Sequence, residues 1–202
     1  MSPARTCRRA RWTPAADRIL LFDGVEELDA VGPWEVLSFW TRSFPEDGYD
    51  VLCLSSAGRP VSCAKGLVLQ AHADMAEAGE LAVLLHPGGR GMRGLMVAPG
   101  HLAWVQHQRR KVPLLTSVCS GALVYAAAGL LAGRPATTHR SLLDRLAEVD
   151  PTIDVRRDER WVDAGDVITS AGIAAGIDMA LHLVARLASK ERSAQVRRGI
   201  EY

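Results

Sequence analysis

The sequence of 202 residues lacks the features of a membrane protein or a nucleic-acid-binding protein. No apolar run reaches the roughly 20 residues that a membrane-spanning helix needs. The 24 basic and 23 acidic side chains nearly cancel, so no basic surface for nucleic acid or anionic lipid is expected. The sequence therefore predicts a small molecule, such as a small-molecule substrate, or a protein as the partner, with no nucleic acid and no membrane.

Cysteine is scarce as well. The four cysteines, Cys7, Cys53, Cys63 and Cys119, form no C-x-x-C pair and have no metal-ligand spacing. We therefore expect no metal site. Cys53 lies within an apolar run, where a thiol is most often a small buried hydrophobic group. Cys119 has a different setting, described below.

The N-terminus lacks the apolar core of a signal peptide. Its first residues read MSPARTCRRARWTPAAD, which is a basic segment. We therefore expect a cytoplasmic protein. Residues 1–16 are expected to form a flexible arm. Residues 17–202, in a chain with 48% hydrophobic content, are expected to form a single domain around one core.

The remaining chain alternates short apolar runs with helical patterns, as α/β proteins do. Strands are predicted at residues 18–23, 50–56, 81–86, 112–118 and 166–172, and helices at 33–41, 91–111, 121–131, 141–149 and 173–192. Polar alternations predict hairpins at 59–72 and 153–166, each turning at a glycine. Because the strands are nearly continuous in apolar residues, we expect a mostly parallel sheet with helices on both faces.

One cysteine stands where a predicted strand turns into a helix. Cys119 follows VPLLTSV and precedes SGALVYAAAGLL, the pattern of a nucleophile elbow with Cys in place of Ser. A thiol at the start of a helix faces free N–H groups and the positive end of the helix dipole, which both favour thiolate. The alternative is a buried turn cysteine without a chemical role.

Two further junctions carry polar or glycine-rich segments where strands end, which is where open α/β sheets bind ligands. In LLHPGGRG, Gly88 and Gly89 can bring N–H groups together around a developing anion, or form an ordinary turn. In DGVEELDAVGPWEV, Asp29 has the least polar neighbours of the four carboxylates within residues 23–29, and desolvation raises a carboxyl pKa. We expect Asp29 to exchange a proton with Cys119.

Two other segments are ambiguous. In RPATTHRSLL, His139 can complete a Cys–His pair, whereas Thr138 and His139 can equally cap a helix or line the pocket. The segment TSAGIAAGID resembles the other junctions but has no ionisable group at its start, so its glycines are expected to serve close packing.

Four blocks in this order, LLFDGVEELDAVGPWEVL, LLHPGGRG, TSVCSGALVYAAAGLLAGRPATTH and VITSAGIAAGIDMALHLVARL, resemble the ThiJ/PfpI superfamily and its isocyanide hydratase-like branch. The resemblance covers residues 18–202. It implies a flavodoxin-like three-layer sandwich with a class I glutamine amidotransferase-like fold, usually a homodimer. Cys119 matches the reactive cysteine, Asp29 its acidic partner and Ser120 the hydroxyl that follows, while Gly88 and Gly89 border the pocket.

The resemblance implies a cofactor-independent hydratase, in which Cys119 and Asp29 convert an isocyanide and water to an N-substituted formamide. One alternative is a non-enzymatic sensor of small molecules or oxidative stress, in which Cys119 is oxidised. Another is a glyoxalase or deglycase acting on α-oxoaldehydes.

Three further features bear on the branch. Ser120 stands where protease-like members carry His, and Asp29 where glyoxalase relatives carry Glu, so both favour the hydratase branch. The segment DAGDVITSAGIAAGIDMALHLV also resembles the sensing domain of AraC-type regulators. The few residues after the last core helix leave no room for a DNA-binding domain, so a regulator is not expected.

Overall fold

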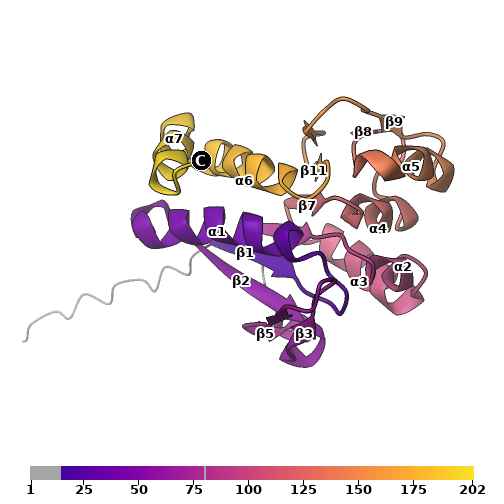
Figure 1. Ribbon diagram of the computed structural model, residues 1–202, viewed down its shortest axis with the longest axis horizontal. Coiled ribbons are helices and arrows are strands. Elements are labelled where there is room, and N and C mark those ends of the chain that lie inside the picture. The colour runs from indigo at the N-terminus through magenta and orange to yellow at the C-terminus, as the bar shows by residue number, and fades with distance from the viewer. Residues whose placement is uncertain (1–14, 80) are drawn as a thin grey trace, which may run out of the picture.

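A computed structural model describes residues 15–79 and 81–202, and these residues form one seven-stranded sheet with helices on both sides (Figure 1). The strand order is β10-β11-β7-β6-β1-β2-β5, and every neighbouring pair is parallel except β10 with β11. The strands are β1 (Ala15–Leu20), β2 (Tyr49–Ser55), β5 (Ala73–Asp74), β6 (Val83–His86), β7 (Leu114–Val118), β10 (Trp161–Asp163) and β11 (Val167–Ser170). The predicted α/β fold with a mostly parallel sheet is confirmed.

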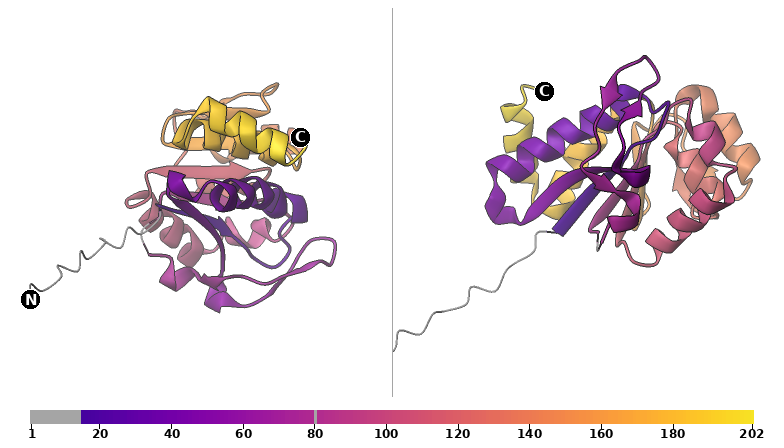
Figure 2. Two further views of the ribbon diagram at one scale, coloured as in Figure 1. Left: turned by 90° about the vertical axis from the view of Figure 1, so that its left-hand side faces the viewer. Right: turned by 90° about the horizontal axis from the view of Figure 1, so that it is seen from below.

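Two groups of helices enclose the sheet (Figure 2). One face is covered by α1 (Glu27–Ser43), α6 (Ala175–Leu187) and α7 (Lys190–Gly199), and the other by α2 (Met92–Leu95), α3 (Pro99–Arg109), α4 (Gly121–Ala127) and α5 (Leu143–Val149). Short 3-10 turns occur at η1 (Pro45–Asp47), η2 (Ser56–Gly58), η3 (Met75–Glu77) and η4 (Arg140–Leu142). The chain thus forms three layers.

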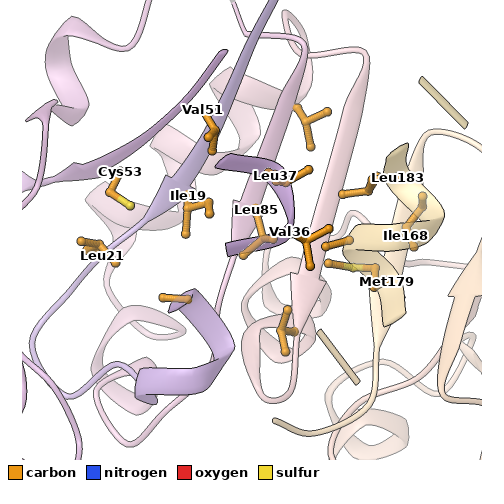
Figure 3. Packing of buried hydrophobic residues seen from close by; sticks show 14 of the residues in the cluster. Ile19, Leu21, Val36, Leu37, Val51, Cys53, Leu85, Ile168, Met179 and Leu183 are labelled. Carbon is orange, nitrogen blue, oxygen red and sulfur yellow. The ribbon is translucent and has the colours of Figure 1, made fainter. Parts of the chain in front are cut away.

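Each face of the sheet buries its own hydrophobic cluster. Figure 3 shows the cluster on the α1 side, where Ile19, Leu85 and Ile168 of the sheet meet Val36 of α1 and Met179 of α6. Because the strands are apolar on both faces, each can contribute to both clusters, which explains their nearly continuous apolar sequence.

Four predicted helix boundaries are wrong. The helix predicted at 121–131 ends at Ala127. The first helix begins at Glu27, so Pro33 lies inside it, where it packs against Gly176 of α6. The helix predicted at 91–111 is divided at Pro99, because the residue before a proline disfavours helical geometry. The helix predicted at 173–192 is divided at Ser189, whose hydroxyl accepts a hydrogen bond from the Arg192 N–H and caps α7 (3.0 Å).

One of the two predicted hairpins is present. β3 (Val61–Ser62) pairs antiparallel with β4 (Val68–Leu69). The second is wrong: β9 (Asp154–Val155) pairs in parallel with β8 (Pro135–Ala136), and β10 turns at Gly165 to pair with β11. The strand β10 therefore pairs with the apolar strand β11, and not with the polar segment that precedes it in the predicted hairpin.

The N-terminal arm falls almost wholly outside the described residues. Only Ala15 and Ala16 of the expected arm are described, and they begin β1. No helix in the described part of the chain is long and apolar enough to cross a membrane.

An aspartate is buried in the first strand. Asp17 lies opposite Val51 and Val83 and is 1% exposed. Neither carboxyl oxygen has a hydrogen-bond partner among the described residues. Burial, followed by the nearby charge of Asp50, raises the pKa of Asp17 well above its usual range.

This burial makes Asp17 a pH-dependent cost to folding. The pKa of Asp17 is higher in the folded protein than in the unfolded chain. Its contribution to the free energy of unfolding is therefore fully present below the unfolded pKa and is lost as pH rises through the folded pKa. We expect Asp17→Asn to gain about 1–3 kcal/mol of unfolding free energy relative to wild type between acidic and alkaline pH. Urea denaturation across that range measures the difference, and a gap that does not widen with pH would contradict the assignment.

Candidate active site

Four loops meet at one edge of the sheet. The strands β11, β7, β6 and β1 are consecutive neighbours, and the carboxyl ends of parallel strands lie at the same edge. The loops after these strands carry Ile173, Cys119, Gly88 and the start of α1 with Asp29. Residues far apart in the sequence therefore converge on one place.

Cys119 occupies a sharp turn between β7 and α4. Its φ is 56°, a left-handed conformation that is uncommon for a residue other than glycine. The Cys119 N–H donates to the carbonyls of Ser170 (3.2 Å) and Ala171 (3.1 Å), and Thr138 Oγ1 donates to the Cys119 carbonyl (2.7 Å). These bonds hold the turn in the shape of a nucleophile elbow.

Asp29 lies beside this cysteine and is fully buried. Its Oδ2 accepts a hydrogen bond from the Gly88 N–H (3.0 Å), and its Oδ1 has no conventional partner among the described residues. Burial raises the pKa of Asp29 to about 7, although Gly88, the Cys119 thiol and the Ile173 amide each lower it. A carboxyl group with a pKa near neutrality can both accept and donate a proton.

The protonation of Cys119 differs from the expectation based on the helix start. Burial, and then the charge of Asp29, raise the pKa of the Cys119 thiol to about 12, while the Ser120 and Ile173 amides lower it. The predicted stabilisation of the Cys119 thiolate is therefore wrong while Asp29 is ionised. The two amides lower the pKa of the thiol by less than burial and the Asp29 carboxylate raise it. Cys119 and Asp29 instead form a pair that shares one proton.

The N–H groups of Gly88 and Gly89 do not point together at an anion site. Each donates to a side chain. The Gly88 N–H is directed at Asp29, and the Gly89 N–H donates to Ser120 Oγ (3.0 Å). A Cβ at Gly88 would lie 2.5 Å from Ser120 Oγ, and one at Gly89, where φ is 123°, would lie 2.3 Å from the Glu26 nitrogen. Both positions therefore need glycine.

His139 makes no hydrogen bond to Cys119 in the described structure. Its Nδ1 lies 2.8 Å from Ser141 Oγ and accepts from the Ser141 N–H (3.3 Å), so it caps the turn η4. Its ring packs against Gly172. Of the two alternatives for the segment 138–139, capping describes His139, whereas Thr138 anchors the backbone of Cys119.

Residues 18–186 match the DJ-1/PfpI family. The chain belongs to the DJ-1/PfpI family. The resemblance noted in the sequence is thereby confirmed, together with the flavodoxin-like fold.

Named relatives in the family differ in their activities. Isonitrile hydratase from Pseudomonas putida is 36% identical over 183 residues, 91% of this chain and 76% of the hydratase. The HTH-type transcriptional regulator CdhR from Pseudomonas aeruginosa is 31% identical over 179 residues, 88% of this chain and 52% of the regulator. The crystal structure of a ThiJ/PfpI family protein from Pseudomonas syringae superimposes with a TM-score of 0.82 at 28% identity, covering 100% of this chain and 82% of that one.

One residue of the candidate site was missed in the sequence. Ile173 has a φ of 54°, an outlier for a β-branched residue, and its amide faces both Cys119 and Asp29. The signal was the resemblance of TSAGIAAGID to the other strand ends. Its glycines do serve packing, because Gly172 contacts His139 and Gly176 contacts Val118, but the residue between them borders the site.

No group of three His, Cys, Asp or Glu side chains within residues 15–79 and 81–202 is placed to hold a metal ion.

Proposed function

We propose that this DJ-1/PfpI protein is a cofactor-independent hydratase that converts an isocyanide and water to an N-substituted formamide. Cys119 is the nucleophile and Asp29 the acid and base. The observation that carries the proposal is a buried carboxyl group with a pKa of about 7 beside a cysteine held in an elbow. The similarity to an isonitrile hydratase supports the substrate class.

In the first half of the reaction, the thiol adds across the terminal carbon of the isocyanide. Asp29 accepts the proton of Cys119 as the sulfur bonds to that carbon, and then delivers the proton to the same carbon. The product is a thioimidate, in which sulfur is bonded to a CH group that is doubly bonded to nitrogen. No net charge is created, which suits a site with a buried carboxyl group.

In the second half, water releases the enzyme. Asp29 takes a proton from water as the oxygen bonds to the thioimidate carbon, and passes a proton to nitrogen. The resulting tetrahedral intermediate then loses the hydroxyl proton to Asp29 as the carbon–sulfur bond breaks. The formamide leaves, and the proton on Asp29 returns to the sulfur of Cys119, so that all atoms and charges balance.

The sensor alternative has less support. Oxidation-sensing cysteines are exposed and have a low pKa. Cys119 is 8% exposed, and its pKa is raised to about 12. These properties favour a thiol that loses its proton only when a substrate is bound and Asp29 accepts that proton.

A formamide-formation assay tests the proposal. A small panel of isocyanides and, separately, methylglyoxal are incubated with wild type, Cys119→Ala and the matched control Cys53→Ala, which removes another buried thiol. We expect wild type and Cys53→Ala to convert an isocyanide, and Cys119→Ala to be inactive. Turnover of methylglyoxal alone would assign the protein to the glyoxalase alternative. If neither substrate is converted, both the hydratase and the glyoxalase proposals are excluded.

The pH profile follows from the shared proton. The pair must hold one proton, so Asp29 has to be ionised before Cys119 can transfer its proton to it. We expect kcat/KM to rise with pH through an apparent pKa of about 7 and then to level off. A profile that falls through this pH range, measured by initial rates, would contradict Asp29 as the base.

The oligomeric state and the location are part of the same proposal. We propose a homodimer, on the basis of the family resemblance, and a cytoplasmic location, as expected from the sequence. Light scattering of the purified chain tests the dimer, because a molar mass near that of one chain would exclude it.

A further inference from the structure

A cleft lies at the carboxyl ends of β1 and β2 and is not lined by Cys119 or Asp29. Its volume is about 660 Å³, within the range of small-molecule sites. The walls come from the loop after β1, the turns η2 and η3, and the helices α2 and α3. Phe22, Met75 and Trp104 are among the residues that line it, so the lining includes two aromatic side chains.

Two carboxylates line this cleft, and each has a free oxygen. Asp23 Oδ1 accepts from the Ser62 N–H (2.9 Å), and Asp74 Oδ1 accepts from the N–H groups of Ala57 and Ala76 (3.0 Å each). No described residue donates to Oδ2 of either aspartate. These bonds fix both carboxylates and leave an acceptor oxygen on each.

His101 adds a third acceptor. His86 Nδ1 lies 2.8 Å from the carbonyl oxygen of Pro87, which can only accept, so this nitrogen carries a proton. Burial, and then His101, lower the pKa of His86 to about 3, so its Nε2 is bare and must accept from His101 Nε2 at 3.0 Å. Burial also lowers the pKa of His101 and favours the neutral ring. Its remaining nitrogen, Nδ1, is then an acceptor.

The charges in the lining favour a cation. Asp23 and Asp74 contribute two negative charges and Arg59 contributes one positive charge, so the lining carries a net charge of −1 (1 − 2) with His101 neutral. The net negative charge therefore lies beside aromatic side chains, whose faces also attract cations.

We propose that this cleft binds a small organic cation, in which an aromatic ring carries a protonated amine. The ring packs against Phe22 and Trp104, and the ammonium group donates to Asp23, Asp74 and His101. The site is separate from Cys119 and does not depend on the proposed hydratase activity.

Tryptamine is the probe, with indole-3-propionate and indole as matched ligands. Indole-3-propionate replaces the ammonium by a carboxylate, and indole has neither charge. For a ligand of this size we expect a Kd of about 1 mM or tighter for tryptamine, measured by ligand-observed NMR or calorimetry on the full chain. Indole-3-propionate should bind at least about tenfold more weakly, because it meets a net negative lining.

Gly100 provides a variant that fills the cleft. It lines the cleft in the first turn of α3, and a Cβ built on it meets nothing within 4 Å. Gly100→Phe should therefore fold and abolish tryptamine binding. Gly94→Phe is the matched control, because Gly94 is equally open but does not line the cleft.

A second variant tests the sign of the charge. Arg59→Ala removes the one positive charge of the lining, so tryptamine should bind about threefold more tightly. Cys119→Ala should leave the Kd unchanged. The proposal is overturned if wild type does not bind tryptamine, if indole-3-propionate binds equally well, or if binding survives Gly100→Phe. Loss of binding in Cys119→Ala would also overturn it, because the ligand would then occupy the candidate active site.

Discussion

Replacement of Asp29 by asparagine is expected to lower kcat for isocyanide hydration by about 10²–10⁴-fold. Asparagine has nearly the same shape and can still accept a hydrogen bond from the Gly88 N–H. It cannot accept the Cys119 proton or deliver protons to carbon and nitrogen. Initial rates of formamide formation measure the loss.

The stability of Asp29→Asn separates chemistry from folding. The folded pKa of Asp29 is raised to about 7, so its stabilising contribution is complete below the unfolded pKa and is lost as pH rises through about 7. The amide does not ionise, so at alkaline pH the variant should be at least as stable as wild type. Wild-type activity in this variant would remove Asp29 from the mechanism. A loss of activity accompanied by unfolding would instead assign Asp29 a structural role.

Gly88→Ala is expected to have the second-largest effect. The added Cβ would lie 2.5 Å from Ser120 Oγ, 2.6 Å from the Ser120 nitrogen and 2.9 Å from Asp29 Oδ2. Because one of these atoms belongs to the backbone of the elbow, the elbow or the Gly88 loop must shift. A displacement of this kind costs about 10²-fold in rate, and crowding of a packed region costs about 1–3 kcal/mol in unfolding free energy.

Gly94→Ala is the control for this variant. A Cβ at Gly94 meets nothing within 4 Å, so rate and stability should stay near wild type. Initial rates and urea denaturation of both variants test the expectation. If Gly88→Ala retains full activity, the hydrogen bond from Gly88 to Asp29 is not needed to position the acid.

The placement of the candidate site could be predicted because it depends on local signals. Continuous apolar runs indicated parallel strands, and a cysteine followed by small residues indicated an elbow. The apolar neighbours of Asp29 in the sequence predict a desolvated carboxyl group, and in the structure Asp29 is buried. These features lie within single segments, where sequence patterns are informative.

The electrostatics of the site could not be predicted in this way. The pKa of Cys119 depends on burial by several elements and on a carboxylate 90 positions earlier (119 − 29). The Gly88 and Gly89 amides find their acceptors on α1 and after β7, so their partners are set by the fold alone. Ile173 adopts a backbone conformation that its own side chain disfavours, so local propensity points away from it.

The start of α1 also could not be predicted from local sequence, because it depends on tertiary packing. Pro33 normally marks the first turn of a helix, but here the helix begins at Glu27. Pro33 lacks the N–H that would bond to the carbonyl of Asp29, and that loss is accepted where α1 packs closely on α6 through Gly32 and Ile177. Tertiary packing therefore overrides the local signal.

In the proposed mechanism, the sulfur of Cys119 bonds covalently to the substrate carbon during turnover. Intact-protein mass spectrometry of samples quenched during isocyanide hydration can detect this covalent adduct. We predict a mass increase equal to one isocyanide, located on Cys119 by peptide mapping, present in Cys53→Ala and absent in Cys119→Ala. Formamide production that continues in Cys119→Ala at the wild-type rate, with no adduct in either protein, would contradict the claim.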